Sequence, residues 1–157
     1  MIRPATGPVD LAMVRDLFQE YAASLGFNLH FQKFDQELAD LPGGYGPPGG
    51  TLLLAMMDGI PGGCVGVRPL EGKICEMKRL YVRPTAREVG LGRALAEAAI
   101  GFGAAAGYRH MRLDTLPTMQ QARTLYESLG FKPIPPYRYN PIPDTLYLER
   151  SLTTSRS

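Results

Sequence analysis

The spacing of apolar residues predicts a helix near the start of the chain. Its apolar positions recur at the intervals of three and four that mark one helical face: Leu11, Val14, Leu17, Phe18, Tyr21 and Leu25. Asp10 stands where a helix cap is expected and Gly26 where the helix ends. The pattern is typical of a surface helix that packs on a flat layer.

Between this helix and the next apolar runs lie a weaker helix over 34–41 and a segment rich in glycine and proline over 42–50. Glycine and proline at this density predict a mobile loop without regular structure. Three short runs of apolar and β-branched residues follow, at 51–57, 63–67 and 73–82. Because Asp-Gly and Glu-Gly turn signals separate them, they predict an antiparallel meander.

The last third of the chain predicts two more helices among strands. A helical face runs from Gly90 to Gly107, a strand covers 110–116, and a second helix ends at Gly130 after the capping-box pattern Thr118 to Gln121. Two closing strands are expected around Ile134 and over 145–152. With a short strand before the first helix, the predicted fold is α+β, with a mixed, mostly antiparallel central sheet of about six to seven strands flanked by helices.

Composition limits the classes of protein that fit this pattern. The 157 residues are 45% hydrophobic, which suits one domain over 1–152 with a flexible tail over 153–157. Because 17 Lys and Arg nearly balance 15 Asp and Glu, without a run of one sign, nucleic acid is not an expected partner. The start lacks a secretory pattern and no stretch is apolar enough to span a membrane, so we expect a cytoplasmic protein without membrane contact.

The two cysteines predict neither a metal site nor a nucleophile. Cys64 and Cys75 lie in strand-like runs with no histidine nearby to complete a ligand set or to activate a thiol. We interpret both as reduced, structural residues, and we expect no metal cofactor.

The glycine pair Gly90 and Gly92, directly ahead of a predicted helix, allows several interpretations. A dinucleotide-binding fingerprint requires a third glycine where Leu95 stands, and a shorter distance from the preceding strand. A P-loop requires Gly-Lys followed by Ser or Thr, but Arg93 and Ala94 follow Gly92. The remaining interpretations are close packing of backbone and an anion site, because free N–H groups at a helix N-terminus attract phosphate.

The sequence "REVGLG" from Arg87 to Gly92 resembles the acetyl-CoA-binding signature of the GNAT superfamily of N-acetyltransferases. A second match is "LYESLGF", Leu125 to Phe131, which is similar to the family's later helix and turn. The order of strands and helices around both motifs also resembles this family over the last two-thirds of the chain. The resemblance implies a GNAT-like acyl-CoA N-acyltransferase fold with acetyl-CoA as co-substrate.

The resemblance also implies which residues hold the cofactor. Strand residues pair with the pantetheine arm as an added strand, and backbone N–H groups at the helix start bind the pyrophosphate. The implied residues are Leu80, Tyr81, Val82, Arg87, Glu88, Val89, Gly90, Leu91, Gly92 and Arg93. The sequence departs from the family at Glu88, often a glycine, and at Met119, where many members carry an asparagine that contacts the cofactor.

Two residues are implied as catalytic. Tyr126 matches the family's tyrosine near the thioester sulfur, the usual acid, although its spacing also fits a buried helix face. Glu76 stands eleven residues before Arg87, where the family's histone acetyltransferases carry their base. A solvent-facing stripe or an ion pair with Lys78 is the alternative interpretation of Glu76. Asp114 and His110 are weaker candidates for the base.

We expect the acceptor pocket to be lined by the segments 21–50 and 133–143, which are rich in tyrosine and proline. Their acids could attract an amine, although scattered acids are more often simply solvated: Asp35, Glu37, Asp40 and Asp144. The predicted function is transfer of acetyl from acetyl-CoA to a primary amine of a small molecule, by direct attack in a ternary complex. The alternatives are a protein lysine or N-terminal acetyltransferase and a non-catalytic acyl-CoA sensor. A homodimer is plausible because the terminal hairpin offers edge strands.

Overall fold

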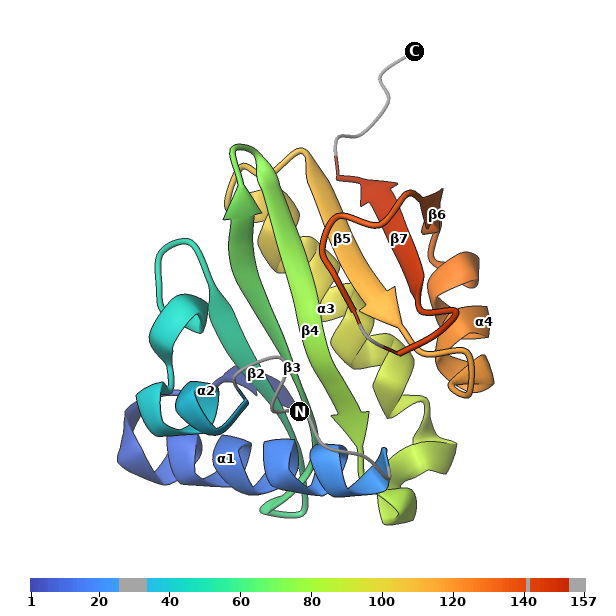
Figure 1. Ribbon diagram of the computed structural model, residues 1–157. Helices are drawn as coiled ribbons and strands as arrows, with labels where there is room; N and C mark the ends of the chain where they lie inside the picture. The colour runs from blue at the N-terminus through green and yellow to red at the C-terminus, as the bar shows by residue number, and fades with distance from the viewer. Residues whose placement is uncertain (26–33, 141, 153–157) are drawn as a thin grey trace.

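The computed structural model describes residues 1–25, 34–140 and 142–152, and this part of the chain forms one seven-stranded sheet with helices on both faces (Figure 1). The strands are β1 (Ile2–Pro4), β2 (Thr51–Met57), β3 (Ile60–Glu71), β4 (Ile74–Val82), β5 (His110–Thr115), β6 (Lys132–Ile134) and β7 (Leu146–Ser151). The helices are α1 (Gly7–Ser24), α2 (Phe34–Asp40), α3 (Leu91–Ala105) and α4 (Gln120–Ser128), with 3₁₀ turns η2 (Gly43–Tyr45) and η3 (Pro84–Val89).

The strand order β1-β2-β3-β4-β5-β7-β6 confirms the predicted mixed sheet. All neighbouring strands are antiparallel except β4 and β5, which run parallel. Their ladder pairs only Ile74–Glu76 with 110–112. Beyond Glu76 the two strands separate, and a gap opens in the middle of the sheet (Figure 1).

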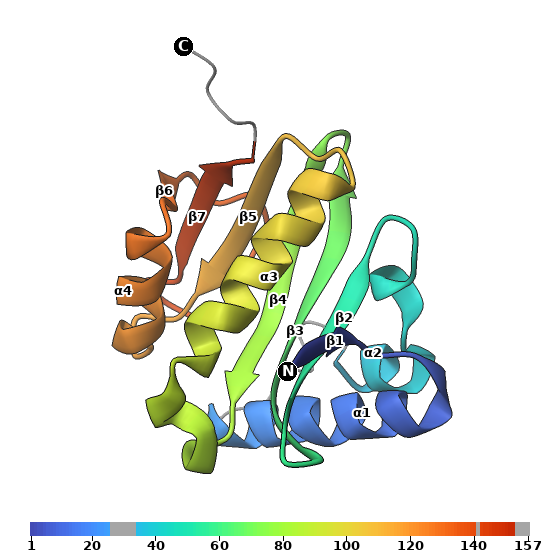
Figure 2. The same cartoon turned by 180° about the vertical axis from the view of Figure 1, so that it is seen from behind.

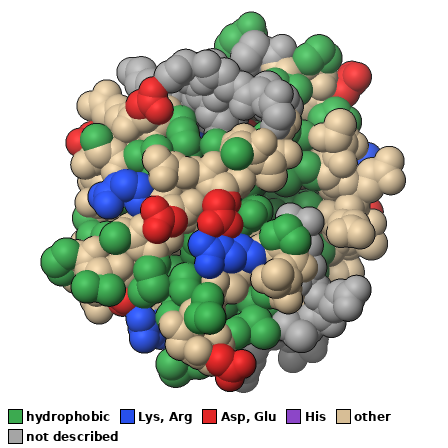
Figure 3. Space-filling view, turned by 90° about the horizontal axis from the view of Figure 1, so that it is seen from below, with side chains coloured by type: hydrophobic (Ala, Val, Ile, Leu, Met, Phe, Trp, Pro, Cys, Tyr) green, Lys and Arg blue, Asp and Glu red, His purple; other side chains and the backbone are tan. Residues whose placement is uncertain are grey.

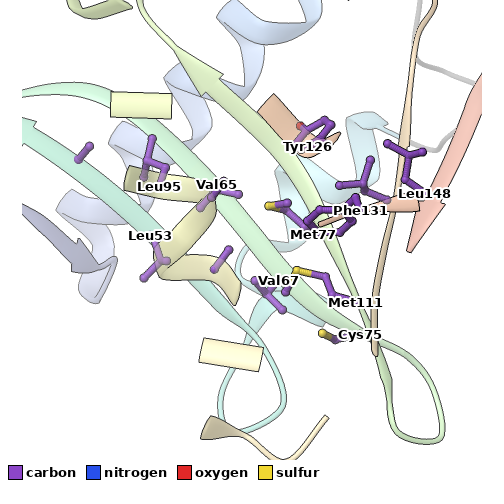
Figure 4. Close-up of a cluster of buried hydrophobic side chains, with 14 of the residues drawn as sticks. Leu53, Val65, Val67, Cys75, Met77, Leu95, Met111, Tyr126, Phe131 and Leu148 are labelled. Atoms are coloured by element: carbon purple, nitrogen blue, oxygen red, sulfur yellow. The ribbon is translucent and has the colours of Figure 1, made fainter. Parts of the chain in front are cut away.

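Two apolar clusters lie on opposite faces of this sheet. α3 covers one face (Figure 2), and its cluster joins strand residues such as Val65 and Met111 to Leu95, with Tyr126 and Phe131 at its α4 side (Figure 4). α1 and α2 cover the other face, where Phe18 packs with residues of β2 and β3. One sheet therefore carries the core on both sides, and its gap lies between the two layers of helices.

Two of the predicted helix starts, those of α1 and α4, differ from the structure. α1 begins at Gly7, with Thr6 as its N-cap, so Asp10 lies inside the first turn. Its carboxylate accepts the Thr6 N–H at 3.0 Å and an Arg3 bond at 2.8 Å, which holds the incoming chain against the helix. α4 begins at Gln120 with Met119 as N-cap and no side-chain cap, so the Thr118 capping box does not form. Gly26, the predicted end of the first helix, lies outside the described residues.

The segment 42–50 was predicted to lack regular structure, and the structure corrects this at one turn. η2 carries Tyr45, which is 2% exposed and packs edge-on against Phe18, with ring centroids 6.0 Å apart. The ring lies on Gly66 of β3, where an added Cβ would come within 2.6 Å of it. The apolar contact of Tyr45 overrides the local preference of the glycines and prolines.

The meander is confirmed, although β3 is longer than the predicted 63–67. Asp58 and Gly59 form the turn between β2 and β3 with φ angles of 52° and 78°, the conformation that an Asp-Gly hairpin turn requires. On the face drawn in Figure 3, acidic and basic side chains are scattered among apolar ones, in line with the small net charge. Among the described helices, none has the length and apolar character needed to cross a bilayer.

Candidate functional site

A groove runs between the end of β4 and the start of α4. On the strand side it is lined by the predicted residues Leu80, Tyr81 and Val82, and on the other side by 118–122. Tyr21 and Ser24 of α1 complete its wall. The structure therefore brings together the strand residues assigned to the cofactor and the start of the helix that carries Tyr126.

The groove leads into a second, more enclosed pocket in the gap between β4 and β5. The two share Tyr21, Leu80 and Met119, so they adjoin each other at these residues. The further lining of the pocket comes from five parts of the chain: Leu25, Met77, Lys78, Arg79, Asp114, Thr115, Leu116, Tyr126, Asn140 and Ile142. Tyr21, Asn140 and Ile142 belong to the two segments predicted to line the acceptor pocket.

The glycine pair forms the turn that starts α3. Arg87, Glu88 and Val89 end η3, and Gly90 then takes φ 71° and ψ 21°, the left-handed conformation that glycine adopts without strain. The first helical bond is donated by Ala94 to the Gly90 carbonyl, at 3.2 Å. The N–H groups of Leu91, Gly92 and Arg93 precede it, so they have no acceptor within the helix and are available to an anion.

The start of α3 is held close to the groove. A Cβ at Gly92 would lie 3.7 Å from a Val82 methyl and 3.9 Å from a Leu125 methyl, which are ordinary contacts. The helix N-terminus thus lies between the end of β4 and α4. The Arg93 side chain donates to the Ser128 hydroxyl at 2.6 Å, so what this residue offers at the helix start is its backbone N–H.

Tyr126 fits both of its interpretations. Its ring packs edge-on against Phe131, with centroids 5.8 Å apart, and only 7% of the residue is exposed (Figure 4). It also lines the enclosed pocket. Burial raises the pKa of its phenol, so the group stays protonated at neutral pH and can serve as a proton donor.

Glu76 lies at the centre of a buried charge network. It is fully buried, with Oε1 accepting from Arg68 Nε at 3.1 Å and Oε2 from the Tyr137 hydroxyl at 2.7 Å. Oε2 also pairs with Arg138, which reaches Asp114 at 3.5 Å. The carboxylate is therefore neither a solvent-facing stripe nor an ion-pair partner of Lys78, the two alternatives that the sequence left open.

These contacts disfavour Glu76 as the base. Burial alone would raise its pKa, but the bond from Arg138 and the charges of Lys78, Arg138 and Arg68 outweigh burial and lower the pKa to about 2. A carboxylate held so firmly in its charged form takes up a proton poorly near neutral pH. Glu76 also does not line the pocket that contains Tyr126. Its role as the base stays a prediction.

The structure separates the two weaker base candidates. His110 begins β5 and pairs with Ile74, whereas the pocket lies at the opposite end of that strand. Asp114 lines the pocket, and it is the one acid among the described lining residues. Asp114 is therefore the carboxylate that an acceptor in this pocket would meet.

Sequence reasoning missed Lys78 as a pocket residue, and Asn140 and Arg138 as individual members of the site. Lys78 lines the pocket from β4 although it is only 6% exposed. The available signal was the pair of charges at Glu76 and Lys78 in an otherwise apolar strand. It marked the face of β4 that looks into the gap, but not the partner of each charge.

Both cysteines are free and buried, as the sequence predicts. Burial raises the pKa of each thiol, that of Cys75 to about 12, so neither is an activated nucleophile. Within the described residues, no three His, Cys, Asp or Glu side chains lie close enough together to hold a metal ion.

The comparisons with known proteins agree with this geometry. The family model described as acetyltransferase (GNAT) family matches residues 11–131. An uncharacterised N-acetyltransferase of Schizosaccharomyces pombe is 45% identical over 148 residues, covering 93% of this chain and 91% of the relative. Another from Escherichia coli is 30% identical, covering 81% of this chain and 77% of the relative. The chain therefore belongs to the acetyltransferase (GNAT) family.

Solved structures support the fold independently. A crystal structure of aminoglycoside 6'-acetyltransferase type Ii superimposes with a TM-score of 0.77 over 99% of both chains, at 17% identity. At that identity the likeness establishes the arrangement of strands and helices alone. Together with the family match, it shows that this member of the GNAT family has the family's fold.

Proposed function

We propose that this protein transfers an acetyl group from acetyl-CoA to a primary amine of a small molecule. The observation that carries the proposal is a groove between the end of β4 and the start of α4 that shares Tyr21, Leu80 and Met119 with a more enclosed pocket lined by Tyr126. The start of α3, with its free N–H groups, lies beside this groove, where Gly92 faces Val82. The groove suits an extended phosphate-bearing cofactor. The enclosed pocket suits a compact acceptor better than a polypeptide.

The reaction needs no covalent enzyme intermediate. The neutral amine attacks the thioester carbonyl, a C–N bond forms, and the C–S bond breaks. Asp114 first receives the proton that the acceptor ammonium gives up, and Tyr126 donates its proton to the departing thiolate. The second proton, which the nitrogen loses as the amide forms, restores the Tyr126 phenol. Neither cysteine takes part, because both thiols are buried and held protonated.

One observation favours a second function, a non-catalytic acyl-CoA sensor. Met119 lies where the groove meets the pocket, and its apolar side chain replaces the asparagine that many family members carry there. A sensor would bind the cofactor without turning it over. The test must therefore measure binding and turnover separately.

The experiment is calorimetry with acetyl-CoA, followed in the same preparation by release of free CoA thiol over polyamines, amino acids, aminoglycosides and lysine peptides. We expect binding, and thiol release that depends on a small amine. Release that depends only on lysine peptides would move the acceptor to proteins. Binding without release from any amine would support the sensor.

A further inference from the structure

We infer that the acceptor carries a carboxylate next to its amine, as an amino acid does, and that Lys78 and Asn140 bind that carboxylate in the pocket between β4 and β5. The inference rests on the proposed function, because it names the class of acceptor for the same site. The inference is drawn from the charged side chains in and around the pocket and from the ion pairs that they form.

Lys78 is the starting observation. A lysine that is 6% exposed is rare unless it is paired, because removing its ammonium from water costs free energy. Among the described residues, no side chain forms an ion pair or hydrogen bond with the Lys78 ammonium, although Asp114 and Glu76 lie close enough to act on it electrostatically. The side chain lines the pocket. A buried lysine without an ion-pair partner among the described residues thus lines the pocket.

The neighbouring cations Arg79, Arg68 and Arg138 each form an ion pair with a carboxylate. Arg79 donates to both oxygens of Glu37, at 3.0 Å and 3.1 Å. Arg68 and Arg138 share Glu76, and Arg138 also reaches Asp114. Among the described residues of this network, four cationic side chains therefore face three carboxylates, and Lys78 is the cation left without an ion pair. An anionic group on the ligand would balance it.

Asn140 supplies a second donor. Its Oδ1 accepts the Ile142 N–H at 2.9 Å, so the amide nitrogen is the end of this side chain left for a ligand. Lys78 and Asn140 both line the pocket, and both side chains can donate hydrogen bonds, as a carboxylate requires.

Asp114 gives the pocket its opposite charge. It lines the same space and is held by one long bond of 3.5 Å from Arg138, so its carboxylate keeps capacity for an ammonium. Lys78 and Asn140 offer donors to an anion and Asp114 offers a carboxylate to a cation, a combination that matches a molecule with both charges. An amino acid is the compact primary amine of that kind.

The experiment compares each amino acid with the amine that lacks its carboxylate: tyrosine with tyramine, histidine with histamine, and leucine with 3-methylbutylamine. Thiol release gives kcat/KM for each member of a pair. We expect the best amino acid to exceed its amine by about 10- to 100-fold, the scale of a hydrogen-bonded charge pair. Equal or faster turnover of the amines would overturn the inference.

Two variants assign the effect. Lys78→Met should bring the ratio between acid and amine close to one while acetyl-CoA affinity, measured by calorimetry, stays unchanged. Lys132→Met, which removes an exposed lysine on β6, should keep the wild-type ratio. A ratio that survives Lys78→Met would overturn the assignment.

If no amine releases thiol, the proposed function fails, and calorimetry of the same pairs with the CoA-loaded protein decides the inference. Binding of the acids in preference to the amines, lost in Lys78→Met, would uphold the anion site without turnover. No preference for the acids would overturn it.

Discussion

The hydroxyl of Tyr126 tests the proposed chemistry at the scale of one residue. Tyr126→Phe keeps the ring that packs on Phe131 and removes only the proton donor. We expect turnover to fall about 10²- to 10⁴-fold with acetyl-CoA affinity retained. Tyr108→Phe is the matched control, because the Tyr108 hydroxyl donates to the Gly49 carbonyl and the residue lines neither the groove nor the pocket. Unchanged turnover in Tyr126→Phe would leave the residue with its packing role alone.

Glu76 tests whether a buried carboxylate acts as a base or as an anchor. Its pKa falls from 4.5 to about 2 on folding, so its charge stabilises the fold above pH 4.5, and that stabilisation is lost as pH falls toward 2. The difference is worth about 3 kcal/mol. Glu76→Gln should therefore unfold more easily at pH 7, and its deficit against wild type should shrink on acidification, as denaturant titrations at several pH values would measure.

The rate profile of Glu76→Gln separates the two roles. As an anchor, Glu76 affects the stability of the network, and the pH dependence of the rate keeps its wild-type midpoints. A profile whose midpoint moves in Glu76→Gln, with wild-type stability toward acid, would restore Glu76 as the base.

Lys78 predicts a pH dependence of ligand binding. Burial and the neighbouring Arg79 lower its pKa to about 8, against the opposing effects of Asp114 and Glu76. As pH rises through 8 the ammonium loses its proton, so affinity for a carboxylate should fall about tenfold by pH 9. An N-acetylated amino acid is the suitable probe because it has no amine to titrate. Calorimetry should show this fall in wild type, and a profile independent of Lys78 would contradict it.

At the scale of an element, the turn that leads into α3 requires a glycine at position 90, because its φ is positive. Gly90→Ala forces a side chain into φ 71° and should cost about 1–2 kcal/mol of stability. Gly101→Ala lies on the exposed side of the same helix, where an added Cβ meets nothing within 4 Å, and should stabilise by up to about 1 kcal/mol. Thermal unfolding of both variants measures the contrast. Equal shifts would show that conformation at Gly90 is not what requires glycine.

Elements with a strong repeat could be predicted from the sequence, and those that depend on distant contacts could not. The face from Leu11 to Leu25 predicted α1, and Asp58-Gly59 predicted its turn, because both signals are local. Tyr45 packs on Gly66, which is twenty-one residues away in the sequence, and no local pattern predicts this contact. The same limit applied to the site: the two charges on β4 were visible, but Arg68 and Arg138 come from other elements.

At the scale of the whole molecule, cofactor binding and stability should be coupled. The groove assigned to acetyl-CoA is lined by residues of α1, β4 and the start of α4, so a cofactor bound there would contact three elements of the fold at once. Acetyl-CoA at 100 times its dissociation constant should add about 2.7 kcal/mol to the free energy of unfolding. Thermal melts with and without it should show one transition that moves upward. An unmoved transition would mean that the folded protein does not bind it.

The segment that contributes Asn140 to the pocket is attached to the sheet through Tyr137 and Arg138. The Tyr137 ring lies beside two guanidinium groups, of Arg138 at 4.9 Å and Arg112 at 5.4 Å. Tyr137 and Arg138 both bind the Glu76 carboxylate. The residues beyond them, Tyr139 and Asn140, carry little of this attachment. Substitutions at Tyr139 and Asn140 can therefore change the tip of this segment without loosening its attachment to the sheet.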